Sequence, residues 1–154
     1  QNTTWTAANS PYLMTGSMVV FPGVTLTIEP GVIVKVTPDY SFNTGNFRYL
    51  EIRGTLVAIG TDANPITFTT DEASAAQGQT WMGISIKGSQ GGNVQMDRFR
   101  LERSWWGISN DIAQPGVSYN WTNCQFKNNN RWKETSSSNA WTKVVCMCGY
   151  ANMW

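Results

Sequence analysis

Val24-Thr25-Leu26-Thr27-Ile28-Glu29-Pro30-Gly31 and, further on, Tyr49-Leu50-Glu51-Ile52-Arg53-Gly54 share one pattern: apolar and polar residues alternate until a turn glycine ends the run. Strict alternation predicts half-buried β-strands, because successive side chains of a strand point to opposite faces. Leu26 and Leu50 lie 24 positions apart in the sequence. A repeat of roughly 20 to 30 residues made of short strands predicts a solenoid, in which each coil lays its apolar residues over those of the coil before.

The alternating pattern continues to about residue 130, in the segments 55–60, 66–70, 82–88, 96–102, 106–108 and 123–129. Phe99 and Cys124 lie 25 positions apart, and Ile66 and Phe99 lie 33 apart because a polar insertion separates them. No segment shows helical periodicity with capping residues. The sequence therefore predicts an all-β solenoid of about five coils over residues 1–130, including an N-terminal cap. An irregular C-terminal tail over residues 131–154 is expected to pack on the solenoid end or on a neighbouring subunit.

Several stretches of the chain resemble a known family, namely residues 11–16, 24–31, 54–60 and 64–69, together with Trp81, Gly83 and Ile84. They are similar to the right-handed parallel β-helix repeats of secreted proteins, whose fold is that of the pectin-lyase-like superfamily. The resemblance covers roughly residues 5–130 and implies a right-handed parallel β-helix and secretion. It implies little about activity, because this fold carries lyases, hydrolases, adhesins and structural domains.

Length and charge bound the classes of partner. The 154 residues suit a single domain, and a net charge of +1 gives no electrostatic reason to expect nucleic acid or an anionic membrane. No apolar run approaches the roughly 20 residues that cross a bilayer. Asn2 and Asn120 satisfy the N-glycosylation pattern, which fits the extracellular or cell-surface location that the resemblance implies.

Three cysteines, Cys124, Cys146 and Cys148, lie in the last third of the chain. In an oxidising compartment Cys124 can pair with either of the other two and staple the tail to the last coil. Alternatively, Cys124 is a small core residue, because it takes the position that Phe99 holds one coil earlier. Neither a metal site nor a cofactor is expected, since the chain has no histidine and only three cysteines.

The absence of histidine also excludes Ser-His-Asp and Cys-His catalysis, because no imidazole is available as a base. The sequence offsets stack each acidic residue on a basic or neutral one: Asp97 on Thr122, Glu102 on Lys127 and Glu29 on Arg53. The sequence therefore predicts no pair of carboxylates on adjacent coils, which is what a retaining glycosidase needs. We expect no enzyme activity. A polysaccharide lyase would have one basic cluster to use, formed by Arg98, Arg100 and Lys127.

Eight tryptophans and five tyrosines favour a role in binding or assembly. Four tryptophans lie outside the repeating coils and are candidates for subunit contacts: Trp5, Trp132, Trp141 and Trp154. Three further rings are candidates for stacking on sugars: Trp105, Trp106 and Tyr119. Trp105 and Trp106 are consecutive, so on a strand one of the two rings should be exposed.

Three hypotheses follow from these residues. The first is a secreted structural or adhesive solenoid whose partner is itself, as a homo-oligomer or filament, or another extracellular protein. The second is a non-catalytic module that binds polysaccharide, and the third is a polysaccharide lyase. Self-association that salt does not weaken favours the first, retention on insoluble glycans favours the second, and release of unsaturated oligosaccharides favours the third.

Overall fold

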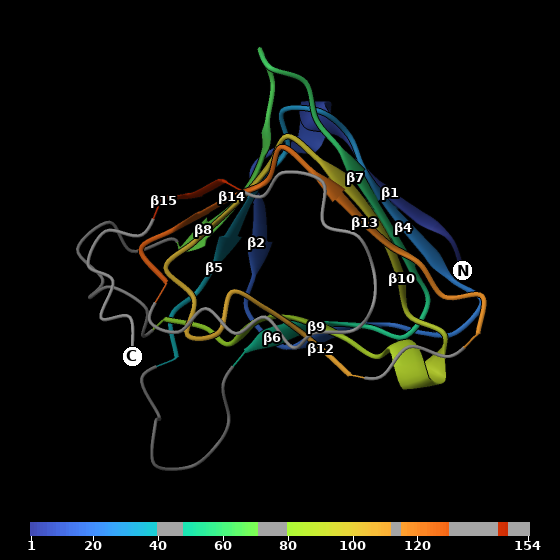
Figure 1. Ribbon diagram of the computed structural model, residues 1–154. Coiled ribbons are helices and arrows are strands. Elements are labelled where there is room, and N and C mark those ends of the chain that lie inside the picture. Colours follow the sequence, from blue (N-terminus) through green and yellow to red (C-terminus); the bar gives the residue numbers. More distant parts are fainter. Residues whose placement is uncertain (40–47, 71–79, 112–114, 130–144, 148–154) are drawn as a thin grey trace.

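A computed structural model describes residues 1–39, 48–70, 80–111 and 115–129, together with the backbone of residues 145–147. The chain forms a right-handed parallel β-helix whose three sheets are the sides of a triangular prism (Figure 1). From β1 to β14 the strands visit the three sheets in a fixed cyclic order, so each complete coil contributes one strand to each side. The predicted fold class is confirmed.

The strands are short, as expected for a solenoid. Sheet A contains β1 (Thr3–Trp5), β4 (Thr25–Ile28), β7 (Thr55–Ile59), β10 (Asn93–Asp97) and β13 (Tyr119–Thr122). Sheet B contains β2 (Tyr12–Met14), β5 (Ile33–Val36), β8 (Ile66–Thr70), β11 (Phe99–Glu102), β14 (Gln125–Lys127) and β15 (Val145–Met147). Sheet C contains β3 (Met18–Val20), β6 (Tyr49–Ile52), β9 (Gly83–Ile86) and β12 (Ile108–Asn110). Two 3₁₀ turns complete the described elements, η1 (Ala7–Asn9) and η2 (Gly88–Gln90).

Columns of inward-facing apolar side chains fill the prism, because the period-two alternation points every second residue inward. The register of sheet B stacks Val34, Phe68, Leu101 and Phe126. The register of sheet C stacks Leu50, Ile84 and Ile108. All of these side chains are buried, and each contributes about 1.5–3 kcal/mol to the driving force for folding.

One predicted register is wrong. Leu26 stacks on Leu56 in sheet A, whereas Leu50 lies in sheet C between Met18 and Ile84. The stretches 24–31 and 49–54, from which the repeat was inferred, therefore form two different sides of the same coil. The predicted stacking of Glu29 on Arg53 is wrong for the same reason: Arg53 instead pairs with Glu51 of its own coil, at 2.5 Å.

The register predicted for the later coils is confirmed. Leu101 pairs with Phe126, and Phe99 pairs with Ile66. Asp97 pairs with Thr122, and Glu102 pairs with Lys127, as the 25-residue offset predicted. Within the tail, β15 adds a strand to sheet B beyond β14, while the remaining tail residues lie outside the described ranges.

Arg48 holds the corner between sheets B and C. Its Nη1 donates to the carbonyl oxygens of Thr37 and Pro38, each at 2.6 Å. Its Nε donates to the carbonyl oxygen of Thr15 in the preceding coil, at 2.8 Å. One side chain therefore ties the backbones of two successive coils together where they turn toward sheet C.

Candidate functional site

A hollow of about 180 Å³ lies at the corner between sheets A and B. We call it the corner groove. It is lined by Thr61, Asp62, Pro65, Arg98, Phe99, Arg100, Asn123 and Gln125. These residues come from three successive coils, so the groove runs along the solenoid rather than across a single loop.

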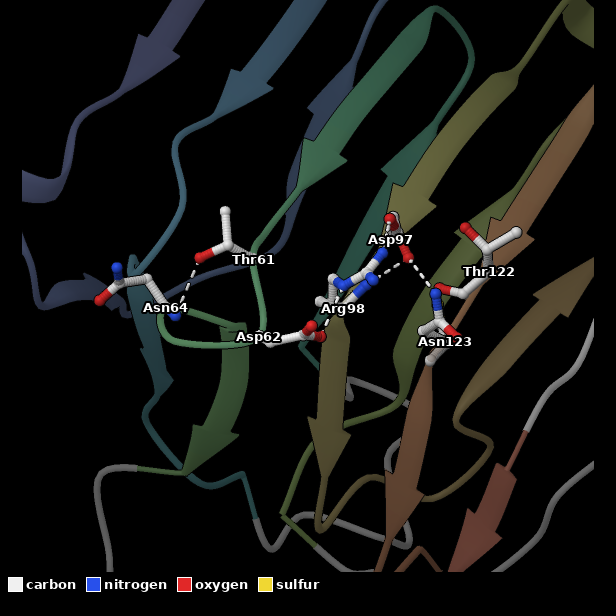
Figure 2. Close-up of polar contacts among 8 residues, drawn as sticks. Thr61, Asp62, Asn64, Asp97, Arg98, Thr122 and Asn123 are labelled. Atoms are coloured by element: carbon white, nitrogen blue, oxygen red, sulfur yellow. Dashed lines mark hydrogen bonds and ion pairs between the residues drawn. The ribbon is translucent and has the colours of Figure 1, made fainter.

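Successive coils turn this corner with connections of different length, and the difference in length creates the hollow. Between β7 and β8 the chain takes the loop 60–65, whose Thr61 and Asn64 hydrogen-bond to one another. One coil later only Arg98 separates β10 from β11. The longer loop therefore projects beyond the tight corner below it, and Asp62 points from the loop toward Arg98 (Figure 2).

The tight corners require an unusual backbone. Arg98 and Asn123, at equivalent places in successive coils, have φ of 44° and 50°, in the left-handed region. Asparagine adopts this conformation far more readily than arginine. Arg103 and Asn128 repeat the pairing after β11 and β14, with φ of 58° and 57°. Left-handed residues other than glycine are often found at functional sites, because the surrounding structure must hold them there.

Hydrogen bonds to two carboxylates hold Arg98 in place. Its Nε donates to Oδ1 of Asp62 at 2.7 Å, and its Nη1 donates to Asp97. Asn123 donates from Nδ2 to Oδ1 of Asp97 at 2.9 Å, so the coil below joins the same network (Figure 2). The hydrogen bonds to Asp62 and then Asp97 raise the pKa of Arg98.

The charge of Asp97 is stabilised by the same network. Partial burial acts to raise the pKa of Asp97, but hydrogen bonds from Asn123, Thr122 and Arg98 outweigh it and hold the pKa below its usual value. The network therefore favours the charged form of both side chains.

The predicted basic cluster is assembled only in part. Arg100 lines the groove, where its Nε donates to Oε1 of Gln125 at 3.2 Å and lies 3.9 Å from Oε1 of Glu102. Lys127 stands on β14 in register with Glu102 and is exposed. Within the described ranges, His, Cys, Asp and Glu form no group of three or more that could hold a metal ion.

The structure places the candidate sugar-stacking residues away from the groove lining. Trp105 and Trp106 lie in a bend rather than on a strand, and their backbone amides donate to the carbonyls of Trp81 and Met82. Both are half-buried, so the expectation of one exposed ring is wrong, because alternation applies only on a strand. Tyr119 packs partly against the core, and burial, reinforced by the charge of Asp111, raises its pKa.

Trp5 is not outside the coils, as the sequence suggested. It lies on β1, only 8% exposed, and stacks on Tyr12 with 5.1 Å between ring centroids. The premise for making it a subunit contact is therefore wrong. The other three candidates, Trp132, Trp141 and Trp154, lie outside the described residues.

Cys124 is buried in the core, as expected of a small apolar residue. Burial raises the pKa of its thiol to about 12. Cys146 pairs in register with Phe126 on β15, its side chain is not among those described, and Cys148 lies outside the described residues, so the disulfide considered for Cys124 stays a prediction.

The two N-glycosylation candidates are both exposed. Asn2 accepts a hydrogen bond from the Thr25 amide at 2.9 Å through its Oδ1, and Asn120 stands on the outer face of β13. Their occupancy stays a prediction.

Of the groove residues, sequence reasoning selected only Arg98 and Arg100 and missed the polar residues Asp62, Asn123 and Gln125. A usable signal was present: Asp97-Arg98 is followed 25 positions later by Thr122-Asn123, which places an arginine and an asparagine at the same corner. The composition of Thr61-Asp62-Ala63-Asn64-Pro65 is typical of a turn, but nothing in it shows that Asp62 reaches the next coil.

The comparisons with known proteins agree with this architecture. A family model described as a pectate-lyase-like beta helix domain matches residues 1–102. The match includes the loop 60–65, Arg98 and Arg100, and ends before Asn123 and Gln125. No curated protein and no solved structure matches the chain. In the described part of the chain, no helix is long and apolar enough to span a membrane.

Proposed function

The chain belongs to the family of pectate-lyase-like beta helix domains, and on this basis we propose that it is an extracellular adhesive β-solenoid. It holds polysaccharide in the corner groove and does not cleave it. The observation that carries the proposal is the groove itself, in which polar side chains from three coils are fixed by hydrogen bonds to one another.

The groove has the chemistry of a saccharide site. Carboxylate, guanidinium and amide groups line it, and these planar groups can each bind two neighbouring hydroxyls of a sugar ring. Because Arg98 and Asn123 are already held in place, binding costs little side-chain ordering. Successive coils repeat at about 4.8 Å, which lets a chain of sugar rings follow the solenoid.

The state of Arg98 favours binding over catalysis. A lyase must remove a proton from its substrate, and an arginine can do so only if its pKa falls far below the usual value. The pKa of Arg98 is instead raised by its bonds to Asp62 and Asp97. The groove is therefore suited to holding a chain and unsuited to abstracting a proton from it.

Retention on insoluble polysaccharides tests this proposal. We expect the wild-type protein to be retained, and Asn123→Ala and Arg98→Ala to lose retention. The matched control is Gln95→Ala, on the exposed outer face of sheet A, which should bind as the wild type does. Equal retention of all four proteins would contradict the proposal. Release of unsaturated oligosaccharides would show that the protein is a lyase.

A second candidate function is self-association, favoured by exposed apolar residues in the first coil. Leu13 and Phe21 are each 59% exposed, and Met18 is 38% exposed. Light scattering of the wild type and of a Leu13→Ser, Phe21→Ser double variant tests it. A concentration-dependent oligomer that the double variant abolishes supports assembly, whereas a wild-type monomer at all concentrations excludes it.

A further inference from the structure

The groove carries no excess of positive charge, although two arginines line it. Arg98 is paired with Asp62 and Asp97, and Arg100 lies 3.9 Å from Glu102. Two guanidinium groups thus face three carboxylates, and with Lys127, which is in register with Glu102, the charges of this corner balance. The side chain of Asp62 is 88% exposed and stands at the entrance formed by the loop 60–65.

An anionic chain fits this arrangement poorly. Two donors of Arg98 are used by Asp62 and Asp97, so a uronate carboxylate that accepts from the remaining N–H groups lies beside two like charges. The charge-assisted bond that the uronate gains is offset by repulsion from these two carboxylates, which already neutralise the guanidinium.

A neutral polyhydroxyl chain meets neither difficulty. Its hydroxyls donate to the carboxylate oxygens of Asp62 and accept from the guanidinium and amide N–H groups of Arg98 and Gln125. The hydrogen bonds among Arg98, Asp62 and Asp97 remain intact while these contacts form, because each of these groups offers more than one hydrogen-bonding position.

We propose that the ligand of the corner groove is a neutral polysaccharide and not a polyuronate. This inference rests on the proposed function, since it names the chemical class of the chain that the groove holds. Asp62 is the residue that sets the preference, because its carboxylate both neutralises Arg98 and repels anions at the entrance.

The test measures binding of soluble neutral polysaccharides (dextran, mannan and xyloglucan) and of polygalacturonate, by affinity electrophoresis and calorimetry at low and at physiological salt. We expect a neutral chain to bind, with an affinity that salt does not change. Gln125→Ala should weaken this binding about tenfold or more, the cost of losing hydrogen bonds in a polar site. Gln95→Ala, on the opposite side of the corner, should leave it unchanged.

Asp62→Asn is the decisive variant, because it removes the repelling charge from an exposed position without a threat to folding. It should weaken binding of the neutral chain and create salt-sensitive binding of polygalacturonate. Tighter binding of polygalacturonate than of every neutral chain by the wild type would overturn this inference and leave the proposed function standing. Absence of binding to both classes would overturn the two together. Far-UV circular dichroism of each variant confirms that it is folded.

Discussion

Two corners of this β-helix are each held by an arginine, and they differ in what the arginine binds. Arg48 donates to three backbone carbonyls, at 2.6–2.8 Å. Arg98 donates to two side-chain carboxylates, one of them on a projecting loop. The carbonyl oxygens bound to Arg48 serve only to fix the backbone of the corner. The carboxylates bound to Arg98 still have oxygen atoms exposed to solvent. The first corner is built for stability, and the second can also meet a ligand.

The largest expected effect comes from breaking the stabilising corner. Arg48→Ala should lower the free energy of unfolding by about 2–3 kcal/mol, because it removes hydrogen bonds from a charged donor and leaves carbonyls unpaired. Denaturant unfolding followed by circular dichroism measures this. Arg48→Lys should recover only part of the loss, since an ammonium group lacks the planar fork of donors. Polysaccharide binding should not change in either folded variant, and a loss of binding there would contradict the division between the two corners.

The Arg98 corner can be tested through Asn123, its counterpart in the next coil. Asn123→Ala should cost about 1–2 kcal/mol, because alanine is unfavourable at a φ of 50° and the bond to Asp97 is lost. Asn123→Gly loses the bond but accepts the backbone conformation, so it should cost less. Equal losses in unfolding free energy would mean that backbone strain contributes nothing at this corner.

The thiol beneath the Arg98 corner gives a pH dependence. Cys124 keeps its proton in the folded state up to about pH 12, whereas the unfolded chain releases it near the usual thiol pKa. Stability is therefore complete below about pH 8 and falls as the pH rises, by about 1.5 kcal/mol at pH 10. The free energy of unfolding is measured at pH 7 and pH 10 for the wild type and for Cys124→Ala. The variant keeps every other titrating group, so the comparison isolates the effect of the thiol. The fall in unfolding free energy between pH 7 and pH 10 should be smaller in the variant by the contribution of the thiol. An equal fall in both proteins would show that other groups cause it.

The smallest effect on stability is expected for Asp62→Asn. The side chain is almost fully exposed, and exposed ion pairs contribute little because water screens them. The unfolding midpoint should stay within experimental error while polysaccharide preference changes. A marked fall in the midpoint would make Asp62 a second stabilising residue and would remove the contrast between the corners.

The fold could be predicted from the sequence because alternation and glycine-ended runs act locally. The register of the early coils could not, since Leu26 and Leu50 carry the same pattern on different sheets. Connections of unequal length between strands make a constant offset misleading there. The corners from β10 to β11 and from β13 to β14 are both short, so the 25-residue offset holds for the strands on either side and gives the correct pairs.

The candidate site was harder to predict for a related reason. Arg98 and Arg100 could be selected as basic residues, but their neutralisation depends on Asp62, which lies 36 positions before Arg98. The alternating pattern of the strands does not predict this contact, because Asp62 lies in the loop 60–65, which is not part of the repeating strands. The interpretation of Trp5 is wrong for a different reason: it precedes the repeats that the sequence shows, but pairing with β4 and packing on Tyr12 bury it.

The cyclic order of the strands has a consequence for how the molecule folds and unfolds. Because every strand pairs only with its equivalents one coil away, each coil contacts little beyond its two neighbours. The energetics are then close to those of a one-dimensional chain of coupled units, in which order spreads from unit to unit. Hydrogen exchange should accordingly be slowest in β7 and β8, at the middle of the stack, and faster toward the terminal coils.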